Sequence, residues 1–419
     1  MIIRKPWLLA TALSLCLASI PSQALEGKVV DADTNAAIAD AIVTLGNDVV
    51  RTDKDGHFKT QASADRVLAR APGYRATAIA ASDFAKAGNV TQLHSFRPKA
   101  LYLSAFTMAY APKRTADMQL IQSTGLNAVV VDLKNDEGLV DYPTSVALAS
   151  TIGARRVTTM HNLAATVAHL HEQQLYAIAR IVVFKDRLVA NTHPEWSVKM
   201  EDGSVYHDHE GSTWVDPFFQ EHHDYVVALA VEAAQAGFDE IQFDYIRFPD
   251  ARGLKFSQPN TESNRIGAIT ALLTQARTAL IPYNVFLAAD AFGYTSWNTD
   301  DTRIGQHLED MLSVVDYLSL MLYPSGFQFG IPGYLDPVSH PYEIVHLSLD
   351  HAETRAKVPG IRFRPWLQNF RDYAFDHRSF GADEVAAQVR AADDSGTDGW
   401  MLWNPRNIYT YSPMQTSAK

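Results

Sequence analysis

The residues of this sequence best suited to chemistry are aspartates at the ends of apolar runs. Asp244 lies in the stretch 237–250, GFDEIQFDYIRFPD, where apolar and polar side chains alternate, and Arg247 follows it. A carboxylate at the end of an apolar strand costs free energy unless it is paired or used. Asp132 and Asp290 stand at the ends of two other apolar runs. Paired carboxylates suit the cleavage of glycosidic bonds, in which one protonates the leaving oxygen and the other attacks or positions water.

The elements that must position these aspartates alternate between strand and helix patterns from about residue 99 onward. The expected strands are 100–109, 128–133, 176–184, 240–246, 285–291, 317–323, 362–369 and 399–403. The expected helices are 114–123, 162–173, 224–236, 263–280, 303–314, 342–357 and 382–394. Alternating units with nearly continuous apolar strands indicate a parallel sheet buried on both faces, and eight of them predict an α/β fold closed into a (β/α)8 TIM barrel. A doubly wound open sheet is the alternative, but no glycine-rich phosphate loop follows the first strand.

The residues after the strands of such a barrel gather at one face, where enzymes of this fold place catalytic groups. Acidic residues end the second, fourth and fifth strands, whereas aromatic and amide side chains dominate the others. Aromatic faces with hydrogen-bonding rims suit sugar rings. We expect Asp244 and Asp290 to be the catalytic pair. The side chains expected to bind substrate are Asp132, Lys134, Lys185, Trp214, Arg247, Tyr323, Gln368, Trp403 and Asn404.

Each aspartate also has a structural interpretation. Asp244 could belong to an ion network with Arg247 or Lys134, and Asp290 could cap the turn before Gly293. Asp132 is two residues from Lys134 on the same strand face, which favours an orienting or structural pair there. If Asp290 is only a cap, Asp132 or the nearby Asp136 becomes the second carboxylate.

The long segment 186–223 is expected to be a loop that covers the cleft. It contains His207, His209, His222 and His223, but their spacing matches no established zinc pattern. We therefore expect no metal site and no organic cofactor.

Residues 25–98 form a separate unit of short alternating runs and turn residues, with a hairpin signal at 53–56. Several short strands without a helical pattern predict a small all-β sandwich. Residues 1–24 have the charged, apolar and small-residue regions of a signal peptide, and the apolar run is too short to span a membrane comfortably. The only cysteine, Cys16, lies within it, so the expected mature chain has no disulfide or thiolate chemistry.

Partner and location follow from these features and from charge. The net charge of -11 disfavours nucleic acid as a partner, because no basic stripe is present. We expect an exported protein, periplasmic or secreted, with no membrane span. The sequence leaves the oligomeric state open.

Several strings resemble the bacterial putative glycoside hydrolase family of TIM barrels. They are FDYIRFP at 243–249, VVVDLKNDEG at 129–138, MLYPS at 321–325, ARIVVFKD at 179–186 and WNP at 403–405. The resemblance covers about residues 100–410 and implies sugar chemistry, with Asp244 as a catalytic carboxylate and Asp290 as its partner. It places Asp132, Lys134, Arg247 and Tyr323 around the site.

The order GKVVDADT, AIVTL, TDKDGHF and APGY in residues 25–98 resembles the carboxypeptidase regulatory-like domain, which implies an accessory module.

The resulting hypothesis is a glycoside hydrolase that acts on an extracellular or cell-envelope polysaccharide. Asp244, held ionised by Arg247 or Lys134, would be the nucleophile or electrostatic stabiliser. Asp290, in an apolar setting, would have the raised pKa of a general acid/base. Two alternatives remain: a non-catalytic, lectin-like barrel that binds glycans, and an envelope scaffold that binds protein through the β-sandwich.

Overall fold

The computed structural model describes residues 25–411, so the expected signal peptide, residues 1–24, lies outside the described residues. The N-terminal part forms two small sheets with the orders β4-β1-β7 and β3-β2-β5-β6. Their strands are β1 (Leu25–Asp31), β2 (Ile42–Leu45), β3 (Asp48–Arg51), β4 (His57–Thr60), β5 (Arg66–Arg70), β6 (Thr77–Ala80) and β7 (Val90–Leu93). Val29 and Phe58 of one sheet share a buried core with Val43 of the other.

One short helix, α1 (Ala81–Lys86), belongs to this unit and was not predicted. Its six residues are too few to show a helical period in the sequence, and Phe84 anchors it in the core between the sheets.

The rest of the described chain contains a closed barrel of eight parallel strands, which confirms the predicted fold class. Around the barrel the strands follow sequence order: β8 (Lys99–Leu103), β9 (Ala128–Lys134), β10 (Tyr176–Val182), β12 (Glu240–Asp244), β14 (Phe286–Phe292), β15 (Tyr317–Met321), β16 (Trp366–Gln368) and β17 (Trp400–Trp403). A separate pair, β11 (Lys199–Met200) and β13 (Leu254–Lys255), joins two loops.

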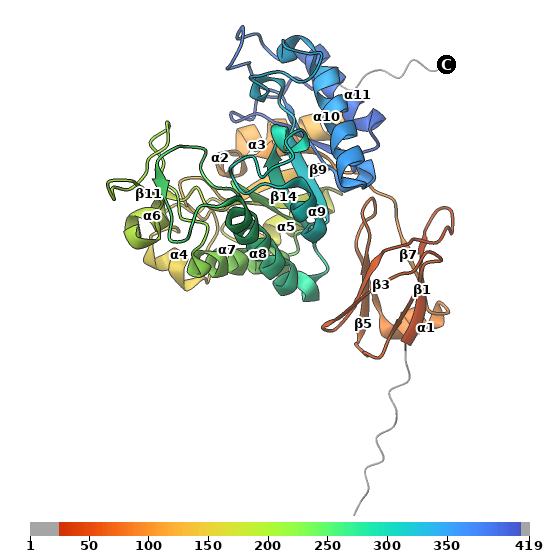
Figure 1. The fold of residues 1–419 in the computed structure, drawn as a ribbon. Coiled ribbons are helices and arrows are strands. Elements are labelled where there is room, and N and C mark those ends of the chain that lie inside the picture. Colours follow the sequence, from red (N-terminus) through yellow and green to blue (C-terminus); the bar gives the residue numbers. More distant parts are fainter. Residues whose placement is uncertain (1–24, 412–419) are drawn as a thin grey trace, which may run out of the picture.

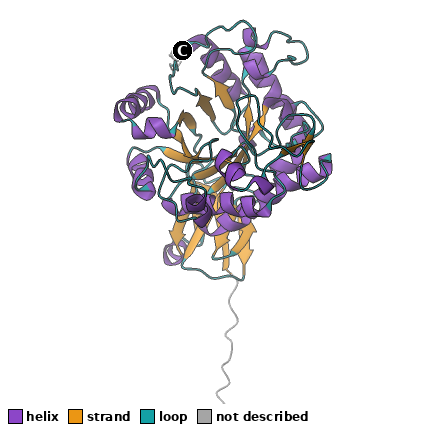
Figure 2. Ribbon diagram, turned by 90° about the vertical axis from the view of Figure 1, so that its left-hand side faces the viewer, coloured by secondary structure: helices purple, strands orange, loops and turns teal. Residues whose placement is uncertain are grey.

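Helices surround the barrel strands, and the N-terminal sheets lie at one end of the barrel (Figures 1 and 2). The helices of this part are α2 (Ala105–Ala109), α3 (Ala111–Thr124), α4 (Ala147–Thr151), α5 (Leu163–Glu172), α6 (Arg187–Thr192), α7 (Gln220–Ala236), α8 (Glu262–Leu280), α9 (Leu308–Val314), α10 (Pro341–Ala356) and α11 (Ala382–Asp394).

Among the predicted boundaries that differ from the structure, three have a clear local reason. The first strand stops at Leu103, because the Ser104 side chain accepts a hydrogen bond from the Thr107 amide and begins α2. The fourth strand stops at Asp244, because Tyr245 has a left-handed backbone with φ 48°. Helix α9 begins later than expected, after a turn in which residues 302, 303 and 305 all have positive φ.

The strands bury both faces, as a parallel barrel requires. Along β12, Ile241 and Phe243 point outward into the large core beneath the helices, whereas Gln242 and Asp244 point inward. Val130, Ile178 and other inward residues form a second apolar cluster inside the barrel. The same alternation places Asp132, Arg180 and Asp290 inside, near the carboxyl ends of their strands.

The N-terminal sheets dock against the opposite, N-terminal end of the barrel strands. The backbone amide of Gly73 donates to the hydroxyl of Tyr317, the first residue of β15, at 3.3 Å. Arg70 is buried and donates to Asn284, just before β14, at 3.2 Å. This unit therefore lies at the far end of the barrel from the carboxylates Asp244 and Asp290.

Candidate active site

An arginine inside the barrel joins two of the predicted site carboxylates, Asp244 and Asp132. Arg180 of β10 donates to Oδ2 of Asp244 through Nε at 2.9 Å and through Nη2 at 2.5 Å. Its Nη1 donates to Oδ1 of Asp132 at 2.6 Å. The expected partners of Asp244, Arg247 and Lys134, form no ion pair with it, so that part of the prediction was wrong. Asp244 is paired instead with Arg180, which lies on the neighbouring strand.

Asp244 retains contact with solvent, and its side chain is 11% exposed. Its Oδ1 accepts a hydrogen bond from the amide of Tyr245 at 2.6 Å. A tyrosine at positive φ is strained by about 1–3 kcal/mol, and such strain occurs chiefly where the backbone serves a site. The turn that ends β12 thus fixes the carboxylate at the barrel mouth.

Asp132 has both carboxylate oxygens occupied. Tyr102 of β8 donates its hydroxyl to Oδ2, and Arg180 occupies Oδ1. The Trp403 ring stacks on Tyr102 with centroids 4.0 Å apart, and the Arg180 guanidinium lies 5.0 Å from the centre of the Trp403 ring. Asp132 and Trp403 therefore hold Arg180 in place.

The last residue pair between β12 and β14 is Phe243 with Ala289, and Asp290 follows Ala289 directly along β14. Its Oδ1 accepts hydrogen bonds from Gln242 at 2.7 Å and from the Trp366 indole at 2.8 Å. Its Oδ2 is buried and has no hydrogen-bond partner within residues 25–411.

Burial, and secondly the negative charge of Asp244, raise the pKa of Asp290 well above its usual range. Both effects favour the protonated form of the Asp290 carboxyl. The cap interpretation was wrong, since no side chain caps the turn at Gly293.

Tyr323 lies beside both carboxylates. Burial raises the pKa of its hydroxyl, and the charges of Asp290 and Asp244 raise that pKa further. The side chain is half-buried, and its hydroxyl makes no hydrogen bond to any residue between 25 and 411. The Tyr323 hydroxyl is free to meet a ligand.

Lys134 faces away from this site. A β-bulge between β9 and β10 pairs Asp132 with Arg180 but Lys134 with Ile181, so Asp132 and Lys134 lie on opposite faces. The Lys134 ammonium is fully buried in an ion pair with Asp186 at 2.9 Å. The expectation of a shared face was wrong, because the sequence gives no sign of the bulge.

Lys185, Trp214 and Arg247 form a second group, in the loops after β10 and β12. Lys185 lies within 4 Å of Asp136, Asp208 and Glu210. The Trp214 ring is buried and donates from its indole to Asp208, while the Arg247 guanidinium lies 4.6 Å from the ring centre. Trp214 therefore supports Arg247 and offers no open face.

Two predicted binding amides have structural partners. Gln368 is fully buried and donates to the Ser325 hydroxyl at 2.7 Å while accepting from the Ser325 amide at 3.1 Å. Asn404 donates to the carbonyls of Asn369 and Ile408. Both amides hold loops at the barrel mouth.

Sequence reasoning missed four residues that complete the site: Tyr102, Arg180, Gln242 and Trp366. Each lies on the inward face of its strand, and Gln242 shares that face of β12 with Asp244. Arg180, a charged residue in the apolar strand YAIARIV, is the clearest signal of the four.

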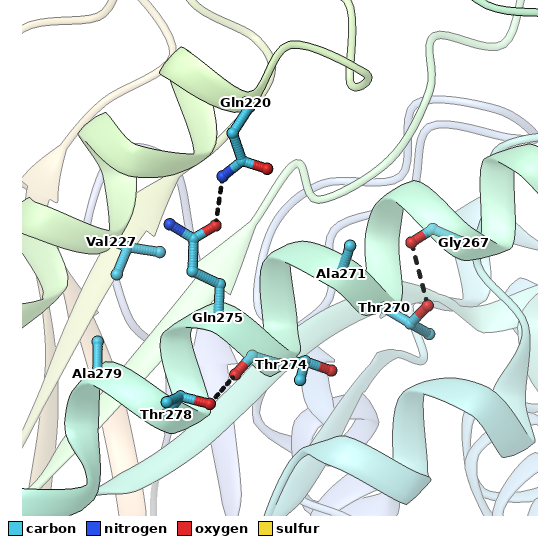
Figure 3. Close-up of a pocket in the computed structure, with 9 residues that line it drawn as sticks. All are labelled: Gln220, Val227, Gly267, Thr270, Ala271, Thr274, Gln275, Thr278 and Ala279. Atoms are coloured by element: carbon cyan, nitrogen blue, oxygen red, sulfur yellow. Dashed lines mark hydrogen bonds between the residues drawn. The ribbon is translucent and has the colours of Figure 1, made fainter.

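A groove on the outer surface of the barrel lies apart from the carboxylate site. It runs between α7 and α8 and is lined by small and amide side chains, including Thr270, Thr274 and Gln275 (Figure 3). It contains no ionisable side chain, and its helices form the outer layer of the barrel. Catalysis by carboxylates has no basis there.

Within residues 25–411, no helix is long and apolar enough to cross a membrane. In the same part of the chain, no three histidine, cysteine, aspartate or glutamate side chains are grouped so as to hold a metal ion. His222 and His223, on α7, instead hydrogen-bond to the carbonyls of Val183 and Pro217.

Comparison with solved structures shows the barrel fold. The glycoside hydrolase domain of PgaB (BpsB) from Bordetella bronchiseptica is 15% identical over 74% of this chain and 95% of that chain, with a TM-score of 0.54. A β-galactosidase from the psychrophilic Marinomonas ef1 is 12% identical over 73% of this chain and 54% of that chain, with a TM-score of 0.52. A hypothetical protein from Ruminiclostridium thermocellum ATCC 27405 is 34% identical over 45% of this chain and 96% of that chain, with a TM-score of 0.41.

No curated protein matches the chain. Residues 100–409, which include all of the barrel strands but the first residue of β8, match the family model described as "Putative glycosyl hydrolase domain". The chain therefore belongs to the putative glycosyl hydrolase domain family.

Proposed function

We propose that the protein hydrolyses glycosidic bonds in an extracellular or cell-envelope polysaccharide, with Asp244 and Asp290 as the catalytic pair. One observation supports this most directly: two inward carboxylates at the ends of adjacent strands have opposite environments. Asp244 is ion-paired with Arg180, whereas Asp290 is buried with one unpartnered oxygen and a raised pKa. Glycosidases separate the roles of their two carboxyl groups by such a difference in environment.

The reaction assigns one role to each group. Asp290 donates its proton to the glycosidic oxygen, so the bond to the anomeric carbon breaks and the leaving sugar departs as an alcohol. Asp244 attacks the anomeric carbon and forms a glycosyl ester. Asp290, now a carboxylate, removes a proton from water, and the resulting hydroxide equivalent attacks the same carbon and releases Asp244.

Strand geometry favours this double displacement, which retains the anomeric configuration. Asp244 and Asp290 each follow the last paired residues of two adjacent strands, and adjacent strands lie about 4.8 Å apart. Carboxyl groups of retaining enzymes are about 5–5.5 Å apart, whereas inverting enzymes need about 6.5–9.5 Å to hold a water molecule between them.

The test is the release of reducing ends from a panel of bacterial envelope and secreted glycans. The wild type is expected to release reducing ends, and Asp244→Asn and Asp290→Asn to lose this activity while folding normally by circular dichroism. Asp33→Asn, an exposed aspartate of the N-terminal unit, is the matched control and should stay active. Equal activity in Asp290→Asn and Asp33→Asn, with loss in Asp132→Asn, would refute the assigned pair.

A non-catalytic glycan-binding barrel is the second candidate, and the burial of Asp290, which is only 1% exposed, favours it. This function requires no carboxylate to reach the substrate. It predicts glycan binding that persists in Asp244→Asn and no release of reducing ends by the wild type.

We also infer export to the periplasm or the medium. Strand β1 begins at Leu25, so cleavage after residue 24 would leave all the described strands intact. Expression of the full chain in a Gram-negative host, followed by fractionation and N-terminal sequencing, should give an exported protein that begins at Leu25. A cytoplasmic product that retains residues 1–24 would contradict this inference.

A further inference from the structure

An exposed aromatic ring stands at the edge of the candidate active site, in the loop after β16. Tyr373 is 54% exposed, and its ring lies at 9° to that of Phe370, with centroids 6.2 Å apart. Phe370 makes an edge-to-face contact with Tyr323, with centroids 5.3 Å apart. Tyr323 in turn packs against the apolar cluster inside the barrel, where the charges of Asp290 and Asp244 act on its hydroxyl. These three rings, the aromatic track, lead from the carboxylates to solvent.

The loop that carries Tyr373 is held in one conformation by a buried carboxylate. Asp372 is 2% exposed and accepts hydrogen bonds from three backbone amides of the loop at 2.8, 2.9 and 3.1 Å. The hydroxyl of Ser325 donates to the same carboxylate at 2.7 Å, and Gln368 donates to that hydroxyl. A ring on such a fixed loop needs little ordering when a ligand binds.

The tryptophan side chains that the sequence predicted to bind substrate are less open than Tyr373, which the sequence analysis did not single out. Trp214 is buried beneath Arg247, and Trp403 is half-buried with Tyr102 stacked on it. Tyr373 has the largest free surface on the aromatic track. A free ring face beside hydrogen-bonding groups suits the apolar face of a pyranose.

We propose that Tyr373 and Phe370 form a sugar-binding subsite next to the cleavage position, and that the ligand is an oligosaccharide or polysaccharide chain. This inference rests on the proposed function in so far as the ligand is a glycan. It adds the position of a second bound sugar, and it requires binding but not hydrolysis.

The experiment measures binding in the Asp244→Asn background, so it does not depend on turnover. Native gels containing dextran, alginate, soluble β-glucan or partially deacetylated chitosan are run with Asp244→Asn alone and combined with Tyr373→Ala, Tyr373→Phe or Tyr110→Ala. Tyr110 is the matched control, an exposed tyrosine stacked on Phe106 at the start of α3.

Retardation of Asp244→Asn by at least one polysaccharide is expected. Loss of the Tyr373 ring should weaken that binding about tenfold, as expected for one stacking contact, while Tyr373→Phe should bind normally. Equal weakening by Tyr110→Ala and Tyr373→Ala would overturn the subsite, as would the absence of retardation in every gel. Binding that depends on Tyr373 but is accompanied by no reducing-end release from wild type would support the subsite and refute hydrolysis.

Discussion

Replacing Asp290 by asparagine should separate stability from activity. Asparagine has nearly the same shape as a protonated aspartate, and its oxygen can accept the hydrogen bonds from Gln242 and Trp366 that Oδ1 accepts now. If Asp290 is neutral in the folded protein, the substitution removes no charge. It removes only the proton that catalysis requires.

The size of the effect follows from the direction of the pKa shift. The unfolded chain releases the Asp290 proton near pH 3.9, whereas the folded protein keeps it to a much higher pH. Wild-type stability therefore falls by about 1.4 kcal/mol per pH unit between these two pKa values, and Asp290→Asn avoids this loss. Against this gain, the amide placed at the buried Oδ2 position lacks an acceptor, which costs about 1–3 kcal/mol.

The assay is urea unfolding of wild type and Asp290→Asn at pH 5 and pH 6. The free-energy difference between them should move by about 1.4 kcal/mol in favour of Asp290→Asn from pH 5 to pH 6, whatever the constant cost of the amide. Asp244→Asn, which breaks the ion pair with Arg180, is the control and should be less stable than wild type at both pH values. A difference for Asp290→Asn that does not change with pH would show that Asp290 is ionised in the folded protein and would refute its role as general acid.

Three further predictions concern the same part of the molecule. Hydrolysis should retain the anomeric configuration by NMR, and azide should restore activity to Asp244→Gly as a glycosyl azide product; inversion would remove Asp244 as the nucleophile. Arg180→Met should lower the free energy of unfolding by about 3–5 kcal/mol, because it strands two buried carboxylates, and adding Asp132→Asn should recover part of that loss in urea unfolding. Burial raises the pKa of Asp372, but hydrogen bonds from Ser325 and from the loop amides outweigh it and lower this pKa to about 2. Asp372→Asn should therefore be less stable than wild type above pH 4, and the difference should shrink as pH falls through 2; a constant deficit would contradict this cause.

The barrel was predictable because its strands carry their own signal. Each is a short apolar run followed by a helical pattern, and the burial of both faces produces runs such as AVVVDLK and YAIARIV. Strand ends were less predictable, since they depend on single backbone conformations. The left-handed Tyr245 that ends β12 belongs to a residue type that rarely adopts positive φ, so no local pattern announces it.

The site was predictable only in part. Alternation along a strand indicates which side chains point into the barrel, but it does not indicate which residues they pair with. Asp132, Asp244 and Asp290 were found at the ends of their strands, but Arg180, which joins two of them, was not singled out. The nearest cations in sequence, Lys134 and Arg247, drew attention instead. Contacts across a barrel join residues 48 or 64 positions apart, and sequence proximity does not predict them.

The barrel contains a second arginine network, and comparing the two shows why only one is a candidate site. At the N-terminal end, Arg364 is enclosed by Glu240 and Asp398, each at most 1% exposed, and the docked N-terminal sheets lie beyond Tyr317. That network is closed to solvent and balances charge within the core. At the other end, Arg180 leaves the Asp244 side chain partly exposed, with a free tyrosine hydroxyl beside it. Because the N-terminal sheets dock at the closed end, they make no contact with Asp244 and Asp290 and leave the open end of the barrel uncovered.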